Sequence, residues 1–112
     1  MSAPAEDAEL RVVLTTAPSA EVADALATAL VEERLAACAN LVPGVTSIFR
    51  WQGAMQREAE VLLLLKTTAA AEGRLRARLL ELHPYDVPEV LALSPVDGYA
   101  PYADWVRDEV EP

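Results

Sequence analysis

Apolar and polar residues follow two patterns along the chain, short apolar runs and helical spacing. Residues 11–16 (RVVLTT) are rich in β-branched side chains and predict a first strand. Val22, Leu26 and Leu30 then recur at the spacing of one helix face. A second strand is predicted to begin near Ala36, to be interrupted at Pro43-Gly44 and to resume over 45–52. The remaining predictions are a third strand over 57–67, a helix that contains Gly73 and ends near Leu82, a fourth strand over 89–93 and a last helix over 99–110.

Capping and turn residues mark where these elements begin and end. Ser19 is placed to cap the first helix, which is predicted over about 20–34. A turn over 53–56 is predicted to join the second and third strands into a long hairpin. Pro84 ends the second helix, because the residue before a proline avoids helical angles. The order β-α-β-β-α-β plus a terminal helix predicts an α+β, ferredoxin-like fold with two helices on one face of a four-stranded sheet.

Three of the predicted strands are apolar on both faces. Residues 12–14, 61–65 and 90–93 are continuous apolar runs, without the alternation of apolar and polar residues that is typical of a sheet with one solvent-exposed face. Such runs are typical of strands that are buried on both sides. Because the two helices can cover only one face, we expect a second copy of the chain to cover the other.

Composition limits the class of protein. The 112 residues are 53% hydrophobic and 24% charged, which suits one folded domain, predicted over 11–112. The net charge is −9 and the basic residues are scattered, so nucleic acid is not an expected partner. No apolar run is long enough to span a bilayer, so a membrane is not expected as a partner either.

The N-terminal residues and the single cysteine bear on location. The first residues are acidic and lack the basic start and apolar centre of a signal peptide, so we expect a flexible N-terminal tail over 1–10. Cys38 has no partner for an internal disulfide. We therefore expect the protein to work in the reducing cytoplasm.

Polar and aromatic groups gather in the segment 82–89 (LHPYDVPE). Two prolines stiffen this segment, which also carries His83, Tyr85, Asp86 and Glu89. One interpretation is a preorganised binding wall. The other is a connector in which His83 caps the end of the helix and Tyr85 packs locally. The residues alone leave both interpretations open.

Three further residues are candidates for a site, and each has a structural alternative. Lys66 is the only lysine and follows an apolar run, which is typical of a charge facing an anion or of a lysine reaching out from a strand end. Trp51, on the predicted hairpin, is interpreted as an interface anchor or as a core residue. Cys38 lies among alanines and is expected to be buried and unreactive.

The sequence lacks the motifs of nucleophilic catalysis, nucleotide binding and structural zinc. With one histidine, one cysteine and four glycines, it has no Gly-x-Ser-x-Gly motif, no glycine-rich phosphate loop and no Cys-x-x-Cys spacing. Binding is therefore favoured over catalysis, and neither an enzyme nor an organic cofactor is expected.

Several segments resemble the CutA family of divalent-cation tolerance proteins. Residues 33–38 (ERLAAC) are similar to the first signature of that family, and 43–53 (PGVTSIFRWQG), 60–67 (EVLLLLKT) and 82–89 follow in the same order. Tyr102 and Trp105 resemble a pair in its C-terminal helix. The resemblance covers about 11–110, and several long motifs in one order are more specific than any short pattern.

The resemblance implies a ferredoxin-like protomer in a tight homotrimer, which takes part in divalent-cation tolerance and binds copper or another divalent cation. It also implies a polar cleft between subunits. Within that cleft a metal is expected at His83, Cys38 and Glu89, ligands that suit copper. The other positions implied for the cleft are Arg34, Trp51, Lys66 and Tyr85. A likeness to PII signalling proteins leaves open an alternative, in which Lys66 and Arg34 hold an anionic small molecule on the same cleft.

Overall fold

Four antiparallel strands and three helices make up the computed structural model, which describes residues 8–112. The strands pair in the order β2-β3-β1-β4. This order, reached by a β-α-β-β-α-β chain, is the ferredoxin-like arrangement, so the predicted fold class is confirmed. The elements are β1 (Leu10–Ala17), α1 (Ala20–Glu32), β2 (Cys38–Trp51), β3 (Ala54–Thr68), α2 (Ala69–Leu82), β4 (Leu91–Leu93) and α3 (Ala100–Glu109).

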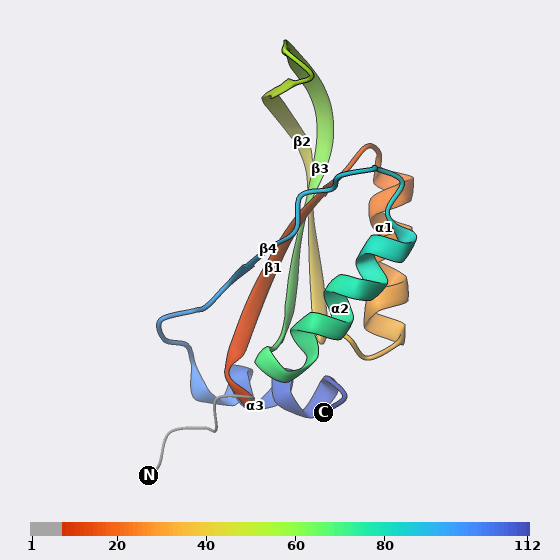
Figure 1. Cartoon of the computed structure of the whole chain (residues 1–112). Coiled ribbons are helices and arrows are strands. Elements are labelled where there is room, and N and C mark those ends of the chain that lie inside the picture. The colour runs from red at the N-terminus through yellow and green to blue at the C-terminus, as the bar shows by residue number, and fades with distance from the viewer. Residues whose placement is uncertain (1–7) are drawn as a thin grey trace.

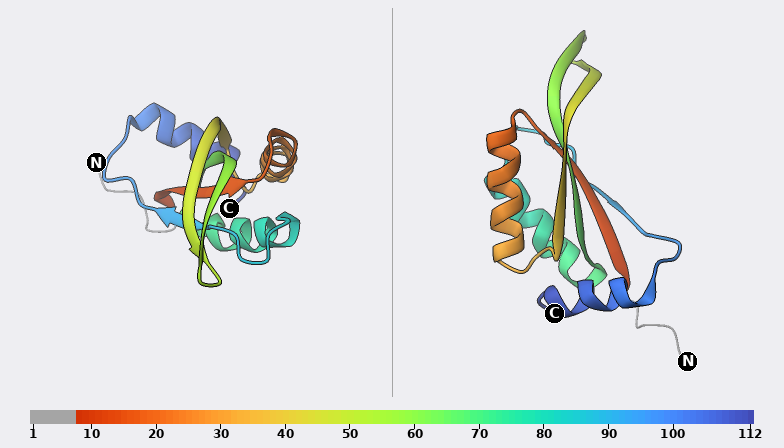
Figure 2. Two further views of the ribbon diagram at one scale, coloured as in Figure 1. Left: turned by 90° about the horizontal axis from the view of Figure 1, so that it is seen from above. Right: turned by 180° about the vertical axis from the view of Figure 1, so that it is seen from behind.

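Helices α1 and α2 lie side by side on one face of the sheet, whereas α3 crosses its lower end (Figures 1 and 2). The layer between them and the sheet is aliphatic. Leu30 of α1, Leu75 and Leu79 of α2, and Leu63 and Leu65 of β3 are all fully buried there. Burying one such side chain contributes about 1.5–3 kcal/mol, so this layer is the main source of stability.

Helix α3 closes a second, smaller cluster at the end of the sheet. Val106 and Val110 pack there against Ala37 and Ala71, with Leu10 of β1 beside them. This arrangement places α3 next to the start of β2, at the opposite end of the sheet from the hairpin tip (Figure 1).

Side-chain caps fix the starts of the two packed helices. The Ser19 hydroxyl accepts a hydrogen bond from the Val22 N–H at 3.2 Å, as its position before α1 predicts. Thr68 caps α2 in the same way through the Ala71 N–H at 3.3 Å. At the other end, α2 stops because His83 takes an extended conformation before Pro84.

Strands β2 and β3 form a long hairpin that extends beyond both helices (Figures 1 and 2). Their register shifts between Val42 and Val45, where Pro43 and Gly44 form a β-bulge and Gly44 has a φ of +76°. The predicted interruption at Pro43-Gly44 is therefore confirmed. The strands continue past this bulge as a projecting hairpin arm, residues 45–60.

The turn at the hairpin tip is shorter than the prediction. It consists of Gln52 and Gly53, because Trp51 already pairs with Ala54, so the predicted turn over 53–56 is wrong. Both turn residues have positive φ angles, 50° and 81°, which a two-residue type I′ turn requires. Strand β3 consequently begins three residues earlier than predicted.

The fourth strand is also shorter than predicted. Only Leu91–Leu93 forms a strand, because β4 pairs with just three residues of β1, Val12, Val13 and Leu14. Pro88 and Glu89 precede the strand instead of opening it. They are left in the loop that follows α2, which becomes one wall of the candidate site.

Of the predicted N-terminal tail, residues 1–7 lie outside the described residues. The Ala8 carbonyl accepts a hydrogen bond from Arg107 Nε at 2.7 Å, and the Glu9 carbonyl accepts one from the Ala69 N–H at 2.8 Å. Strand β1 begins at Leu10, one residue before the predicted start. Among residues 8–112, none of the helices has the length and apolarity of a membrane-crossing segment.

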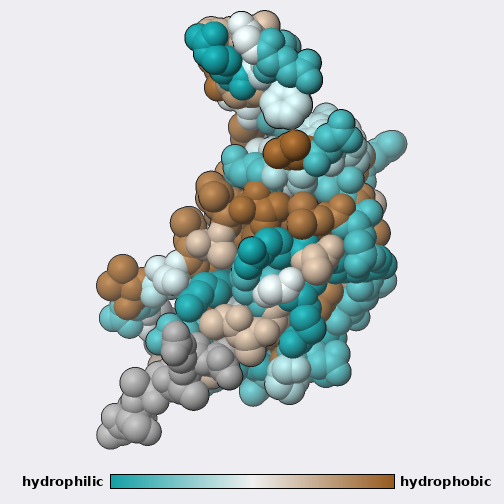
Figure 3. Space-filling view, in the orientation of Figure 1, coloured by the Kyte–Doolittle hydropathy of each residue, from teal (hydrophilic) through white to brown (hydrophobic). Residues whose placement is uncertain are grey.

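The sheet face that points away from α1 and α2 carries aliphatic side chains that residues 8–112 cover only in part. Leu14 of β1 and Leu62 and Leu64 of β3 are half-buried, and Leu91 and Leu93 of β4 are 55% and 49% exposed. Figure 3 shows hydrophobic side chains gathered in a band across the middle of the molecule in this view, with hydrophilic ones above and below it. The apolar runs thus face both sides of the sheet, and a second copy over the open face stays a prediction.

Candidate functional site

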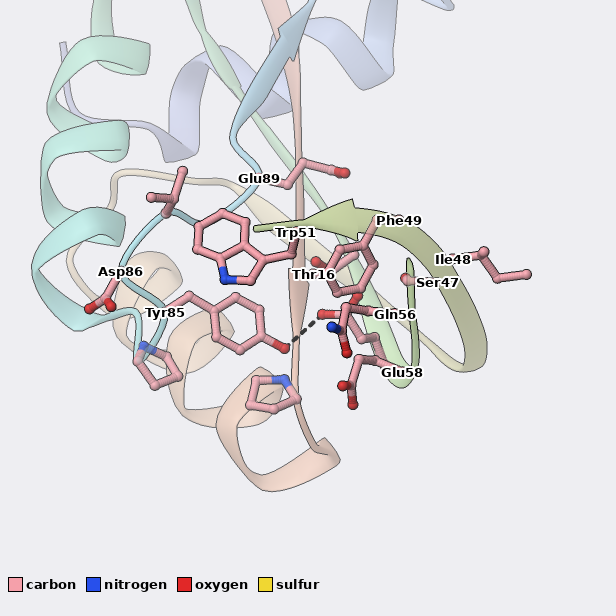
Figure 4. A pocket seen from close by; sticks show the side chains of 14 residues that line it. Thr16, Ser47, Ile48, Phe49, Trp51, Gln56, Glu58, Tyr85, Asp86 and Glu89 are labelled. Atoms are coloured by element: carbon pink, nitrogen blue, oxygen red, sulfur yellow. Dashed lines mark hydrogen bonds between the residues drawn. The ribbon is translucent and has the colours of Figure 1, made fainter. Parts of the chain in front are cut away.

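A cleft of about 910 Å³ lies between the hairpin arm and the loop that follows α2 (Figure 4). The arm brings one wall, the loop brings the other, and the end of β1 forms the floor. The side chains that matter most for its chemistry are Thr16 of β1, Ser47, Phe49, Trp51, Glu58 and Glu60 of the arm, and Tyr85, Asp86 and Glu89 of the loop.

A hydrogen bond joins the two walls. The Tyr85 hydroxyl donates to Glu60 Oε2 at 2.7 Å, drawn as the dashed line in Figure 4. The Glu60 side chain is only 8% exposed. Burial acts to raise the pKa of Glu60, but the hydroxyls of Ser47, Tyr85 and Thr16 outweigh burial and hold that pKa below its ordinary value of 4.5. Glu60 is therefore an ionised carboxylate in a nearly buried position.

The same contact acts on the phenol in the opposite sense. Burial and the neighbouring Glu60 carboxylate raise the pKa of Tyr85, because a second negative charge beside Glu60 is unfavourable. Tyr85 is therefore held as a neutral donor, and its hydroxyl proton points to Glu60.

His83 lies behind this pair and holds the loop in place. Its Nε2 is 2.8 Å from the Thr16 carbonyl oxygen, and its Nδ1 accepts a hydrogen bond from the Tyr85 N–H at 3.1 Å. Because a carbonyl only accepts and an N–H only donates, the imidazole is neutral with its proton on Nε2. The ring also contacts the Tyr85 ring, with centroids 4.8 Å apart. His83 is 7% exposed and both ring nitrogens are occupied, so it orients Tyr85 in this structure.

The remaining walls of the cleft are aromatic and acidic. Trp51 and Phe49 project from the arm and are 45% and 40% exposed. Figure 4 shows the Trp51, Phe49 and Tyr85 rings among the side chains around the cleft, together with Glu89 from the loop and Glu58 from the arm. The lining includes four carboxylates and neither lysine nor arginine, so the cleft carries net negative charge.

A second polar group lies at the other end of the sheet. Cys38 of β2 pairs across strands with Lys66 of β3, and Lys66 Nζ donates a hydrogen bond to Asn40 Oδ1. Cys38 is half-buried instead of buried as predicted, and burial together with the nearby Cys38 raises the pKa of Tyr102 on α3.

Arg34 belongs to this second end and serves a structural role there. Its Nε and an Nη donate to the carbonyls of Glu109 and Asp108 at 3.0 and 2.8 Å, which caps the C-terminus of α3. Arg34 itself has a φ of +60°, a left-handed conformation that is uncommon for a side chain of this size.

The predicted site residues therefore fall into two groups within one chain. Trp51, Tyr85 and Glu89 line the cleft with His83 behind them, whereas Arg34, Cys38 and Lys66 lie at the far end. Two residues of β1 show how far apart the groups lie along the sheet: Thr16 contacts His83, and Val12 pairs with Lys66. Thr16 and Val12 are four residues apart on the strand, or about 13 Å. In the part of the chain that the structure describes, no three histidine, cysteine or acidic side chains gather as metal ligands. A metal held by His83, Cys38 and Glu89 stays a prediction for an assembly.

Sequence reasoning missed Glu60 and Glu58. Both lie at alternate positions of β3, directly before the apolar run, so they share one face of the strand. A carboxylate at the point where a strand enters the core was the available signal. Its pairing with Tyr85 depends on tertiary structure, because the two residues are 25 positions apart.

The fold and the cleft together define a class, a ferredoxin-like α+β domain with an acidic, aromatic cleft at the base of a long hairpin. A family model described as "CutA1 divalent ion tolerance protein" matches residues 11–109. The divalent-cation tolerance protein CutA of Thermus thermophilus is 57% identical over 97 residues, covering 87% of this chain and 94% of that protein. Human protein CutA is 44% identical over 96 residues, covering 86% of this chain and 54% of that protein.

Solved structures agree with these relatives. The structure of the divalent cation tolerance protein from Thermus thermophilus has a TM-score of 0.89 and 54% identity, covering 91% of this chain and 99% of that one. CutA1 from Oryza sativa has a TM-score of 0.90 and 36% identity, covering 96% and 98%. The chain belongs to the CutA1 divalent-ion tolerance family, so the resemblance seen in the sequence is confirmed. The family and the Thermus thermophilus relative are named for divalent-cation tolerance and not as enzymes.

Proposed function

We propose that this chain acts in divalent-cation tolerance in the cytoplasm as a homotrimer that binds the cation, with copper as the expected ion, at the cleft beside Tyr85. The observation that carries the proposal is Glu60. It is ionised and nearly buried, and no ion pair joins it to a basic side chain within residues 8–112. Buried charges in proteins are paired or bind metals, so a cation from outside the chain is the natural partner.

The surrounding side chains favour the same conclusion. Glu58 and Glu89 add carboxylates to the cleft, and neutral His83 lies directly behind Tyr85. Imidazole nitrogen and carboxylate oxygen are donors that suit Cu(II). A metal bound to His83 would have to replace one of its two hydrogen bonds, so the carboxylates are the ligands that need the least rearrangement.

A second copy has two roles in this proposal. It covers the open apolar sheet face, which is typical of an obligate interface. It also offers a way to bring Cys38 to the cleft, because within one chain Cys38 lies at the far end of the sheet from His83. The expected donor set of His83, Cys38 and Glu89 thus requires residues from two subunits.

Calorimetric titration with Cu(II) tests the proposal. We expect Glu60→Gln to weaken Cu(II) binding by about tenfold or more, the range seen when a supporting group of a metal site is removed. Glu21→Gln is the matched control, because Glu21 is an exposed carboxylate at the start of α1 and its loss changes the net charge equally. Equal Cu(II) affinities for Glu60→Gln, Glu21→Gln and the parent would contradict a site at this cleft.

Assembly is tested separately. Size exclusion with light scattering should give three times the 12.1-kDa chain mass at micromolar protein, because large apolar interfaces rarely dissociate there. A mass near 12.1 kDa would refute the homotrimer.

An alternative function is the binding of a small molecule at the same cleft. Its aromatic walls favour this alternative, because Trp51 and Phe49 are exposed in the cleft and cannot serve as metal ligands. The predicted anion held by Lys66 and Arg34 has less support, since the Arg34 guanidinium already caps α3.

A further inference from the structure

We infer that the cleft binds an organic cation, an ammonium group carried on an aliphatic chain, with Glu58 and Glu60 facing the charge and the Trp51 and Tyr85 rings facing the chain. The inference rests on the proposed use of this cleft as a binding site, and it names the class of ligand that the walls fit. A linear aliphatic diamine is the simplest member of that class.

The aromatic walls are the first argument. Trp51 is 45% exposed and Phe49 is 40% exposed, although both are large apolar side chains. Figure 4 shows Trp51, Tyr85 and Phe49 around the same space, and all three line the cleft. A cation within about 6 Å of such a ring is attracted to its negative face, and tryptophan gives the strongest attraction. Aromatic rings do not coordinate divalent metal ions, so their presence points to a ligand with carbon atoms.

The charge of the cleft is the second argument. Four carboxylates line the cleft, and Glu60 is the most buried of them, with Glu58 on the same strand. Neither lysine nor arginine lines the cleft. A neutral or anionic ligand would leave this charge unbalanced, whereas an ammonium group donates to the carboxylate and balances it.

The size and layout of the cleft are the third argument. Its volume of about 910 Å³ lies within the range of small-molecule sites and far exceeds the space that one metal ion needs. Glu58 belongs to the arm wall of the cleft and Glu89 to the loop wall. An ammonium group at each end of a short chain can therefore approach one carboxylate each, while the methylene groups lie against the ring.

The experiment compares three probes on the full chain by calorimetry: putrescine, Mg²⁺ and 1,4-butanediol. Putrescine and Mg²⁺ carry the same charge, and putrescine and butanediol have the same chain length. We expect putrescine to bind at least about tenfold more tightly than either of the others, because only putrescine uses both the carboxylates and the rings. In Trp105→Phe, where Trp51 is the only tryptophan, putrescine should also change the Trp51 fluorescence.

Variants of Trp51 and Glu60 separate the contribution of the ring to putrescine binding from that of the carboxylate. Trp51→Leu should weaken putrescine binding by about threefold to thirtyfold, whereas Trp51→Phe should keep most of the affinity. Trp105→Leu is the matched control, because Trp105 is 43% exposed and does not line this cleft. Glu60→Gln should reduce the preference for putrescine over butanediol without removing any ring, because it removes one of the four carboxylates, and it serves as an independent test if Trp51→Leu alters assembly.

Several outcomes would overturn the inference. Equal binding of putrescine and Mg²⁺ would mean that the cleft responds to charge alone. Equal effects of Trp51→Leu and Trp105→Leu would remove the role of the aromatic wall, and no putrescine binding at millimolar concentration would refute the organic-cation site. The Cu(II) titration keeps this inference separate from the proposed function. Putrescine binding without Cu(II) binding would support the inference and contradict the metal site, and the reverse result would do the opposite.

Discussion

Replacing Tyr85 with phenylalanine isolates the hydrogen bond between the two walls of the cleft. The phenyl ring fits the space of the phenol and keeps its contact with His83, so the hydroxyl is the only group lost. That hydroxyl donates at 2.7 Å to Glu60, which is ionised and 8% exposed. A hydrogen bond to a charged group contributes about 1.5–3 kcal/mol. Because the hydroxyls of Ser47 and Thr16 still support Glu60, we expect the lower end, a loss of about 1.5 kcal/mol in the free energy of unfolding at pH 7.

The pH dependence of that loss follows from the pKa of Glu60, which is lower in the folded protein than its ordinary value of 4.5. A carboxyl with a lowered pKa stabilises the fold fully above pH 4.5, and this stabilisation disappears as the pH falls through the lowered value. Tyr85→Phe removes part of the cause of the shift. The difference between parent and variant should therefore be largest near neutral pH and should shrink in acid.

Urea unfolding of both proteins at one fixed protein concentration, at pH 7 and again below pH 4, measures these differences. Tyr99→Phe is the matched control, because Tyr99 is 77% exposed and lines neither side of the cleft. The control should unfold like the parent. A free energy of unfolding for Tyr85→Phe within about 0.3 kcal/mol of the parent at pH 7 would refute the reasoning, since that is the margin expected for independent surface changes.

Two further pairs of substitutions have contrasting expected outcomes, the glycine pair and Leu65→Ala in thermal or urea unfolding and Leu64→Ala in assembly. Gly73→Ala should stabilise the fold by about 0.5–1 kcal/mol, because the glycine lies inside α2 and an added Cβ would meet nothing within 4 Å. Gly53→Ala should destabilise the fold, because φ is +81° there. A loss of stability in Gly73→Ala would mean that the helix is constrained there. Leu65→Ala should cost about 2–5 kcal/mol, because Leu65 is fully buried under the helices. Leu64→Ala, on the open face, should instead weaken assembly, measured by dilution in light scattering, and an unchanged assembly would place the interface elsewhere.

The sequence predicted the order of the elements and the fold class because each depends on local patterns. Apolar runs, helical spacing, Ser19 and Pro84 are readable within a few residues, and the bulge at Pro43-Gly44 follows from the residue types themselves. The turn at Gln52 and Gly53 was predicted too late, since glutamine gives a weaker signal for positive φ than asparagine does. The length of β4 depends on how far the chain runs alongside β1, which no local pattern encodes.

The candidate site was predicted in part, for the same reason. The loop with His83, Tyr85 and Glu89 was recognisable because its polar and aromatic residues are consecutive. The role of His83 was left open between a binding wall and a cap of the helix end, and its two side-chain hydrogen bonds go to Thr16 and Tyr85 and not to the end of α2. Glu60 was missed because its environment comes from residues on three different elements. Cys38 and His83 were grouped although they lie at opposite ends of the sheet, a separation that only the strand register reveals.

The β-bulge at Pro43-Gly44 separates the helix-covered part of the sheet, the body of the molecule, from the hairpin arm. Between residues 42 and 60 no side chain belongs to either buried cluster, so opening the arm leaves the core intact. We therefore expect amide hydrogens of the arm to exchange through local opening, and those around Leu63 to exchange only on global unfolding. Trp51 lines the cleft from the hairpin arm and Tyr85 lines it from the body, so an occupant in contact with both residues couples the motion of the arm to that of the body. Slower exchange confined to the arm is thus the dynamic signature of a filled cleft.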